Sequence, residues 1–131
     1  MKKINTPLDL NKISCLKAGE EFLLSGTIYT ARDQAHKRLA ESIKKGRRLP
    51  FELKDAVIYY CGPTQTPKCK VIGSCGPTTS SRMDEFTPWL LAQGLRAMIG
   101  KGSRSAAVRD ALKKYRGIYL LTYAGCGALL A

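Results

Sequence analysis

The sequence is poor in acidic side chains, aromatic side chains and long apolar runs, and each shortage narrows the classes of protein it can represent. Ten Asp and Glu face 22 Lys and Arg, a formal net charge of +12, which favours acidic over basic partners. No apolar run approaches the roughly 20 residues of a membrane-spanning helix. Aromatic residues make up only 8%, and no motif of an RNA- or DNA-reading domain is present. These features count against nucleic-acid binding, although the charge alone does not exclude it.

Metal-binding and disulfide patterns are also missing. The five cysteines are Cys15, Cys61, Cys69, Cys75 and Cys126. Their number is odd, no pair has CxxC spacing, and the basic N-terminus lacks the apolar segment of a signal peptide. We therefore expect free thiols, no zinc site and a cytoplasmic protein without a membrane segment.

What is present indicates one globular domain over residues 1–131. Hydrophobic residues make up 44% and charged residues 24%, which is typical of a chain with a packed core. Residues 1–20 resemble a polar arm with scattered apolar anchors. Beyond them, strand patterns are predicted at 22–29, 56–60, 97–99 and 118–122, and helical patterns at 31–45, 84–93 and about 103–115. This alternation predicts an α/β fold.

The stretch from Gly73 to Asp84 is a candidate anion-binding loop. It follows Val71-Ile72, which we expect to end a strand, and it contains two glycines, a proline, five hydroxyl side chains and an arginine. Glycines and a helix start leave backbone N–H groups open to an anion, and the Arg82 guanidinium matches a carboxylate. A capped turn with a surface arginine is the alternative.

Two further strand-to-helix turns carry basic side chains. In the first, at 30–33, Thr30 is a candidate N-cap and Asp33 occupies the capping-box position. The second, 100–103, resembles part of a phosphate-binding loop but lacks the full GxxxxGK[ST] pattern, which excludes a nucleotide triphosphatase. Because such turns meet at the carboxyl ends of the strands in an open α/β sheet, Arg32, Arg82 and Lys101 are expected to converge on one cleft. Three cations there suit a small dicarboxylate.

The predicted helix 31–45 leaves two alternatives open. Its basic residues and those that follow it form either a solvated face or a contact surface for an acidic partner or nucleic acid. They are Lys37, Arg38, Lys44, Lys45, Arg47 and Arg48. The only histidine, His36, is either a hydrogen-bonded structural residue or part of the site.

Three segments together resemble the motifs of one enzyme family. They are TARDQAH at 30–36, GPTTSSRMD at 76–84 and IGKG at 99–102. In this order and spacing they are similar to the beta subunit, or C-terminal domain, of class I (iron–sulfur) fumarases and L(+)-tartrate dehydratases, over about residues 8–131. The resemblance implies a swivelling β/β/α domain, a three-layer α/β arrangement with mixed sheets. It also implies further residues after Ala131, so the domain is expected to be short at its C-terminus.

The resemblance implies a reaction and a partner. The reaction is the reversible addition of water to a small dicarboxylate, with fumarate and malate first and tartrate next. A [4Fe–4S] cluster, acting as a Lewis acid on the leaving hydroxyl, is expected in an alpha subunit and not in this chain, so a hetero-oligomer follows and no metal ligand is expected here. The alternative is a basic, non-catalytic module that binds nucleic acid or an acidic partner protein.

The resemblance also implies roles for individual residues. Thr78 matches a threonine in proton transfer beside the reacting carbon, and it would need activation by a neighbouring charge because a free hydroxyl is a poor base. Arg82 matches a catalytic carboxylate clamp. Three residues are expected to bind substrate: Arg32, Thr79 and Lys101.

Two further residues match the family without a fixed role. Asp33 is expected to orient Arg32 or to cap the helix, and His36 carries no specified function. Cys61, Cys75 and Ser81 depart from the family pattern, since smaller residues are usual at these three positions.

Overall fold

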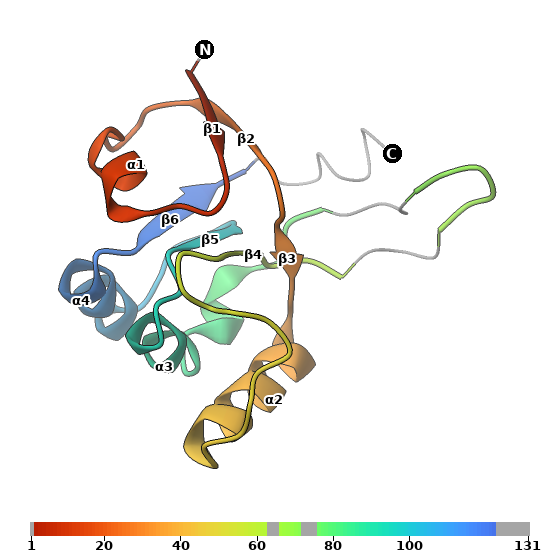
Figure 1. Ribbon diagram of the computed structural model, residues 1–131, viewed down its shortest axis with the longest axis vertical. Coiled ribbons are helices and arrows are strands. Elements are labelled where there is room, and N and C mark those ends of the chain that lie inside the picture. The colour runs from red at the N-terminus through yellow and green to blue at the C-terminus, as the bar shows by residue number, and fades with distance from the viewer. Residues whose placement is uncertain (1, 63–65, 72–75, 123–131) are drawn as a thin grey trace.

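Strands and helices alternate along the chain in the computed structural model, which describes residues 2–62, 66–71 and 76–122 (Figure 1). The elements are β1 (Lys2–Asn5), α1 (Leu10–Ser14), β2 (Phe22–Ser25), β3 (Tyr29–Thr30), α2 (Asp33–Lys44), β4 (Val57–Tyr59), the 3-10 helix η1 (Ser80–Met83), α3 (Thr87–Ala92), β5 (Ala97–Gly100), α4 (Ala106–Tyr115) and β6 (Ile118–Leu121). The predicted α/β class is confirmed.

Four strands form a parallel sheet in the order β3-β4-β5-β6, with the predicted strand β4 inside it. Consecutive strands are neighbours, so right-handed crossovers bring the connecting helices to one face. Figure 1 shows α2, α3 and α4 together on that side. Strands β1 and β2 form a second, two-stranded parallel sheet. Every strand pair in the described residues is parallel, so the mixed sheets that the resemblance implies are not seen there.

The two faces of the larger sheet are covered by different layers. Neighbouring residues of a strand point to opposite faces. Ile58 and Met98, both fully buried, belong to the core that includes Leu39 of α2 and Leu90 of α3. Val57 and Ala97 pack with Leu8 and with side chains of β1, β2 and α1 in a second core. The sheet therefore lies between a helical layer and the N-terminal β1–β2 unit.

The N-terminal segment is ordered structure, and its description as a polar arm was wrong. β1 pairs with β2 along its whole length, with Lys3 opposite Leu23. The sequence KKIN contains a single apolar residue, so no alternating pattern signals a strand. The strand forms because β2 supplies hydrogen-bond partners for its backbone, which a sequence pattern does not contain.

The single strand predicted over 22–29 is two strands that belong to different sheets. The chain turns at Gly26, where φ is 104°. A Cβ at this position would overlap Thr6 Oγ1 and would lie 3.1 Å from Thr6 N. The backbone of Thr6 therefore approaches Gly26 closely, and this is the reason why the strand breaks there.

The predicted ends of helices α2 and α4 agree with the structure, except at the N-terminal end of α2. Gly46, with φ of 65°, follows the end of α2, and Ser105 caps α4 by accepting a hydrogen bond from Val108 N at 3.3 Å. The capping box predicted for α2 is wrong, because Thr30 lies in β3 opposite Tyr59 and Arg32 occupies the N-cap position. Strand pairing takes precedence over capping at Thr30.

Part of the predicted loop at 73–84 lies outside the described residues. Ile72 to Cys75 fall there, and so does the chain from Tyr123 onward. Val71 is fully exposed in a bend, so it does not form the predicted strand end. None of the helices in the described ranges is long and apolar enough to span a bilayer.

The expectation of free thiols holds for two cysteines and fails for one. Cys15 and Cys69 are free and exposed. Cys61 is disulfide-bonded, and its partner is not among the described residues. Spacing along the chain does not show which thiols a fold brings together. Cys61 follows the central strand β4, at a sheet edge where segments distant in sequence meet.

We expect Gly26→Ala to lower the free energy of unfolding by about 2–4 kcal/mol, because alanine is strained at this φ and its Cβ overlaps Thr6. Urea unfolding followed by circular dichroism measures the change. Gly19→Ala is the matched control, since Gly19 has φ of 82° but nothing within 4 Å of its Cβ position. The control should lose only about 1 kcal/mol, and equal losses would contradict the close approach at Gly26.

Candidate functional site

The three predicted turn segments meet at the carboxyl edge of the parallel sheet. Arg32 lies two residues after the end of β3, and Lys101 directly follows β5. The backbone N–H of Thr78 donates to the carbonyl of Tyr60, just beyond β4, with an N–O distance of 2.6 Å. Each segment is therefore attached to the end of a different strand of one sheet. The segment that contains Thr78 is attached by a hydrogen bond to the end of β4 and does not follow the strand end predicted at Val71-Ile72.

Backbone contacts hold the segment containing Thr78 and Thr79 beside Lys101. Thr79 and Lys101 form a parallel bridge, and the N–H of Ser80 donates to the Lys101 carbonyl at 3.0 Å. Thr79 is exposed, whereas Thr78 and Lys101 are half-buried. Two predicted substrate-binding residues and the predicted proton-transfer threonine thus lie on adjacent pieces of backbone.

An ion pair joins η1 to the start of α2. Arg82 Nη2 donates to Asp33 Oδ2, and both side chains are exposed, at 54% and 42%. Asp33 therefore pairs with Arg82, and no contact joins its carboxylate to Arg32 or to a helix-capping position. An exposed pair of this kind contributes only about 0–1 kcal/mol, so a carboxylate ligand can compete with Asp33 for the Arg82 guanidinium.

The Arg32 guanidinium lies over Gly62, at the end of the β4 segment. A Cβ built on Gly62 would lie 2.5 Å from Arg32 Cζ, so a larger residue would displace the guanidinium. Within residues 2–62, 66–71 and 76–122, no carboxylate pairs with Arg32 or with Lys101. These two predicted substrate-binding cations are therefore available to an anion from solution.

His36 lies in the core and not at the surface of the site. It is fully buried, its ring meets the Tyr60 ring edge-on at 5.2 Å, and its Nδ1 lies 2.8 Å from the Arg32 carbonyl oxygen. Because a carbonyl only accepts, Nδ1 carries the proton, and Nε2 is buried without a partner. Burial lowers the pKa of His36. The histidine is hydrogen-bonded to the backbone that carries Arg32, which agrees with the structural alternative of the sequence analysis.

A buried polar cluster behind the site was missed by sequence reasoning. Arg104 is 8% exposed; its Nε donates to Asp84 Oδ1 at 2.7 Å, and its Nη2 donates to Thr87 Oγ1 at 2.8 Å. Its guanidinium also lies over the Tyr60 and Tyr119 rings, at 5.1 and 4.9 Å. Asp84 ends the GPTTSSRMD motif and Arg104 follows the IGKG motif closely, but no periodicity indicates that either is buried.

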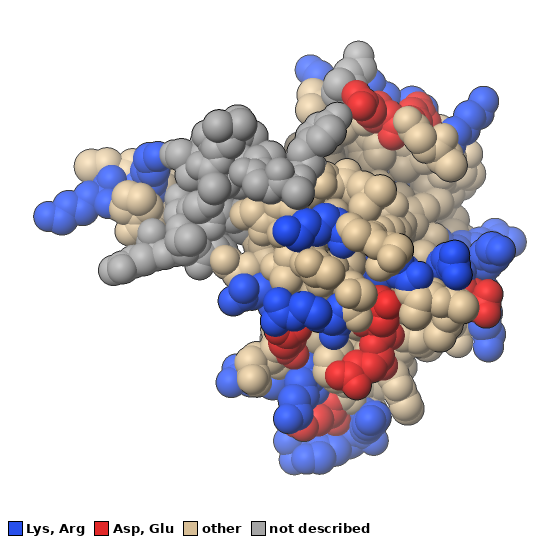
Figure 2. All heavy atoms as spheres, turned by 180° about the vertical axis from the view of Figure 1, so that it is seen from behind, with Lys and Arg blue, Asp and Glu red and all other residues tan. Residues whose placement is uncertain are grey.

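The excess of basic side chains is spread over the surface. Figure 2 shows Lys and Arg across one face of the molecule with Asp and Glu among them. Basic side chains gather at the lower end, where the C-terminal end of α2 lies in Figure 1. Lys37, Arg38 and Lys44 of α2 are exposed, which leaves a solvated face or a contact surface as alternatives.

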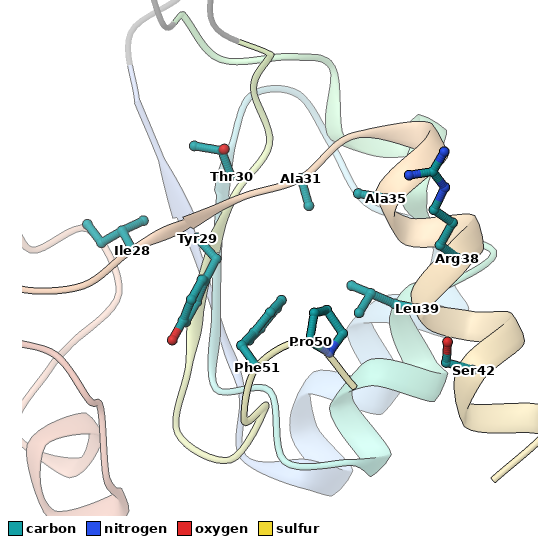
Figure 3. A pocket seen from close by; sticks show the side chains of 10 residues that line it. All are labelled: Ile28, Tyr29, Thr30, Ala31, Ala35, Arg38, Leu39, Ser42, Pro50 and Phe51. Carbon is teal, nitrogen blue, oxygen red and sulfur yellow. The ribbon is translucent and has the colours of Figure 1, made fainter. Parts of the chain in front are cut away.

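Two cavities on the described part of the chain have no predicted site residue in their lining. One, of about 540 Å³, lies beside the edge strand β3 and α2. It is lined by Tyr29 and Phe51, whose rings stack at 4.0 Å, and by Leu39, with Arg38 at its margin (Figure 3). The other, of about 610 Å³, is lined by residues 48–54 and Gln93.

The described side chains do not form a site for a resident metal. The described ranges contain no group of three or more His, Cys, Asp or Glu that could hold a metal ion. The donor set of these described residues does not fit an iron–sulfur cluster.

Fold and site together define a class: an α/β domain whose parallel sheet presents cations and hydroxyls at its carboxyl edge. The comparisons with known proteins agree. The Fumarase C-terminus family matches residues 2–131. The chain therefore belongs to that family, and the expected resemblance to class I fumarases and tartrate dehydratase beta subunits is confirmed.

The chain is similar to parts of longer proteins. It is 42% identical to the aerobic class I fumarate hydratase of Salmonella typhimurium, over 98% of this chain and 23% of that protein. It is 38% identical to fumarate hydratase 2 of Leishmania major, over 98% and 23%. It is 32% identical to the L(+)-tartrate dehydratase subunit beta of Escherichia coli, over 100% and 66%. The chain thus spans about a quarter of the length of these fumarases.

We expect the stability of the chain to fall as the pH is lowered below about 6.5, because the unfolded state then binds a proton at His36 that the folded state does not. Because the pKa of His36 is lower in the folded state than in the unfolded state, its contribution to stability is fully present above the unfolded pKa. Below that pH the free energy of unfolding falls by at most about 1.4 kcal/mol per pH unit. Urea unfolding between pH 5 and pH 8 measures this slope.

His36→Asn is the comparison variant, because its amide N–H can replace the Nδ1 donor without titrating. The variant should lose the part of the slope between pH 5 and pH 6.5. An unchanged slope would show that other groups cause the pH dependence.

Proposed function

We propose that the chain is the beta-subunit domain of a hydro-lyase that reversibly adds or removes water on a small dicarboxylate. Fumarate and malate are the first candidates and tartrate the next. The observation that carries the proposal is the convergence of the three motif segments at one sheet edge, in a chain that belongs to the Fumarase C-terminus family. Relatives from both branches of the family, a fumarate hydratase and a tartrate dehydratase beta subunit, support the same reaction class.

Three cations divide the binding of the two carboxylates. Arg82 offers a planar guanidinium that forms paired hydrogen bonds with a carboxylate. Asp33 holds this guanidinium at the site until the substrate carboxylate takes its place. Arg32 and Lys101 have no carboxylate partner in the described part of the chain and provide the remaining positive charge. Two anchored carboxylates fix the orientation of the carbon atoms between them.

Thr78 and Thr79 supply hydroxyl groups next to these cations. The Thr78 backbone is fixed by its hydrogen bond to Tyr60, so its hydroxyl is held at a defined height above the end of β4. We assign Thr78 to proton transfer at the reacting carbon and Thr79 to substrate binding. A threonine hydroxyl has too high a pKa to act alone, and the charge that activates it comes from the partner subunit.

The proposal requires a partner, a cluster-bearing alpha subunit, and therefore a hetero-oligomer. The exposure of Arg32, Thr79 and Arg82 supports it, because a reaction of this kind needs a site closed to bulk water. The unsuitability of the described side chains as cluster ligands supports it as well. In this proposal the chain contributes clamps and hydroxyls as one swivelling β/β/α domain, and the [4Fe–4S] group belongs to the alpha subunit.

The direct test combines this chain, under anaerobic conditions, with the iron–sulfur subunit encoded beside it. Loss of the ultraviolet absorbance of fumarate should appear in the mixture and in neither subunit alone. Turnover of tartrate but not fumarate would keep the mechanism and change the substrate. With an intact cluster, inactivity towards every dicarboxylate would overturn the proposal and leave the basic binding module as the remaining alternative, tested by salt-dependent nucleic-acid binding.

We expect Arg82→Ala to lower kcat/KM of the assembled enzyme by roughly 100-fold or more, because a carboxylate loses its paired hydrogen bonds and its orientation. Arg82→Lys should recover only part of the loss, since an ammonium group does not match the carboxylate fork. Both variants should unfold within about 1 kcal/mol of the unmodified chain, because the pair with Asp33 is exposed.

The matched control is Arg109→Ala, which removes an exposed arginine on α4 away from the three segments. It should keep full activity. Retained activity in Arg82→Ala would remove Arg82 from the mechanism, and equal losses in Arg82→Ala and Arg109→Ala would point to a general effect of surface charge.

A further inference from the structure

A short chain of hydrogen bonds joins residues 78–84, here called the clamp segment, to the segment that carries Lys101. The Tyr119 hydroxyl lies 2.7 Å from Ser80 Oγ and 2.9 Å from the Gly102 carbonyl oxygen. A carbonyl only accepts, so the single proton of Tyr119 goes to Gly102, and Ser80 donates to Tyr119. Burial raises the pKa of the Tyr119 phenol, which keeps this proton in place at neutral pH.

The two ends of this chain belong to the two segments that carry the predicted site residues. Ser80 is fully buried and lies between Thr79 and Arg82. Gly102 directly follows Lys101. The Ser80 backbone N–H also donates to the Lys101 carbonyl, so side chain and main chain of Ser80 fix the same neighbour from two directions.

The Ser80 side chain occupies a slot that leaves it little freedom. A Cβ on Gly100 would overlap Ser80 Oγ and would lie 2.9 Å from a ring carbon of Tyr60. Only glycine at position 100 therefore admits the serine. Close packing of this kind does not yield to small displacements.

The Tyr119 ring is itself held in place by the buried Arg104. The guanidinium lies over the ring at 4.9 Å and is fixed by Asp84, which follows η1 at the end of the clamp segment. Asp84 Oδ2 also accepts from Ser105 N at 2.9 Å. The clamp segment is thus attached to β6 through Ser80 and to the start of α4 through Asp84.

We propose that Ser80 and Tyr119 are positioning residues that set the distance between the Thr78–Arg82 segment and Lys101. This inference rests on the proposed function, since the positions matter for activity only if the segments bind a substrate. Neither side chain touches the substrate in this arrangement. A clamp displaced by about 1 Å can cost up to about 100-fold in rate, which is the reason for a rigid connection.

Tyr119→Phe is the decisive variant, because it removes one oxygen and keeps the ring beneath Arg104. In the assembled enzyme we expect kcat for fumarate hydration to fall about 10-fold with a smaller change in KM. Tyr115→Phe, a half-buried tyrosine of α4, is the matched control and should keep full kcat. Unchanged kcat in Tyr119→Phe would overturn the inference, as would a loss of stability with no loss of kcat.

A double-mutant cycle with Ser80→Ala tests the connection itself. If Ser80 acts through Tyr119, the double variant should lose little more kcat than the worse of the single variants. Additive losses would show that the two residues act separately and would contradict the proposed chain.

Hydrogen exchange of the isolated chain tests the positioning without any activity. In Tyr119→Phe the Ser80 amide, which donates to Lys101, should exchange about 10-fold faster, whereas Tyr115→Phe should leave it unchanged. An unchanged exchange rate in Tyr119→Phe overturns the positioning role even if the enzyme is active. If the isolated Tyr119→Phe chain shows this faster exchange but the unmodified chain turns over no dicarboxylate in the mixture, the connection stands and the proposed function fails.

Discussion

The site depends on one change of partner along the edge of strand β5. Strand β4 pairs with β5 only as far as Tyr59, opposite Ile99. Beyond that point the segment from Thr78 to Ser80 takes the place beside the chain, through the Thr78–Tyr60 hydrogen bond and the Thr79–Lys101 bridge. Backbone hydrogen bonds that β4 no longer supplies are thereby satisfied. Four predicted site residues lie within a few positions of this exchange, namely Thr78, Thr79, Arg82 and Lys101, and Asp33 pairs with Arg82.

Burial separates the arginines of the chain into two kinds. Arg104 is nearly inaccessible and holds Asp84 and Thr87, so its charge is used within the fold, where loss of one partner would leave the other unpaired and costly. Arg82 makes its ion pair with Asp33 in solvent, where a competing carboxylate can replace the partner at little cost. In the sequence alone, both are basic residues in or beside a motif. Their fractional exposure is what distinguishes a structural cation from one available to a ligand.

The sequence predicts those features that arise from local pattern, and it misses those that arise from long-range pairing. The strands β4, β5 and β6 and the helices α2 and α4 have strong apolar periods and were predicted. β1 has none, and Gly26 divides the largely apolar stretch 22–29 between two sheets because Thr6 approaches it from elsewhere in the chain. At the site, motif positions predicted the convergence of segments on the sheet edge. They did not predict the Arg82–Asp33 pairing or the burial of His36, since both depend on contacts between elements.

Three cations at one sheet edge also constrain how the site can close. The isolated chain tolerates the three cations because water screens their mutual repulsion. Of Arg32, Arg82 and Lys101, only Arg82 has a carboxylate partner among the described residues. If a partner subunit covers this edge, water is removed and the repulsion grows as the local dielectric constant falls. An anion in the site offsets that cost, and a dicarboxylate offsets it twice. In the proposed enzyme, closure and substrate binding are therefore coupled by electrostatics, because the empty site resists the desolvation that the occupied site permits.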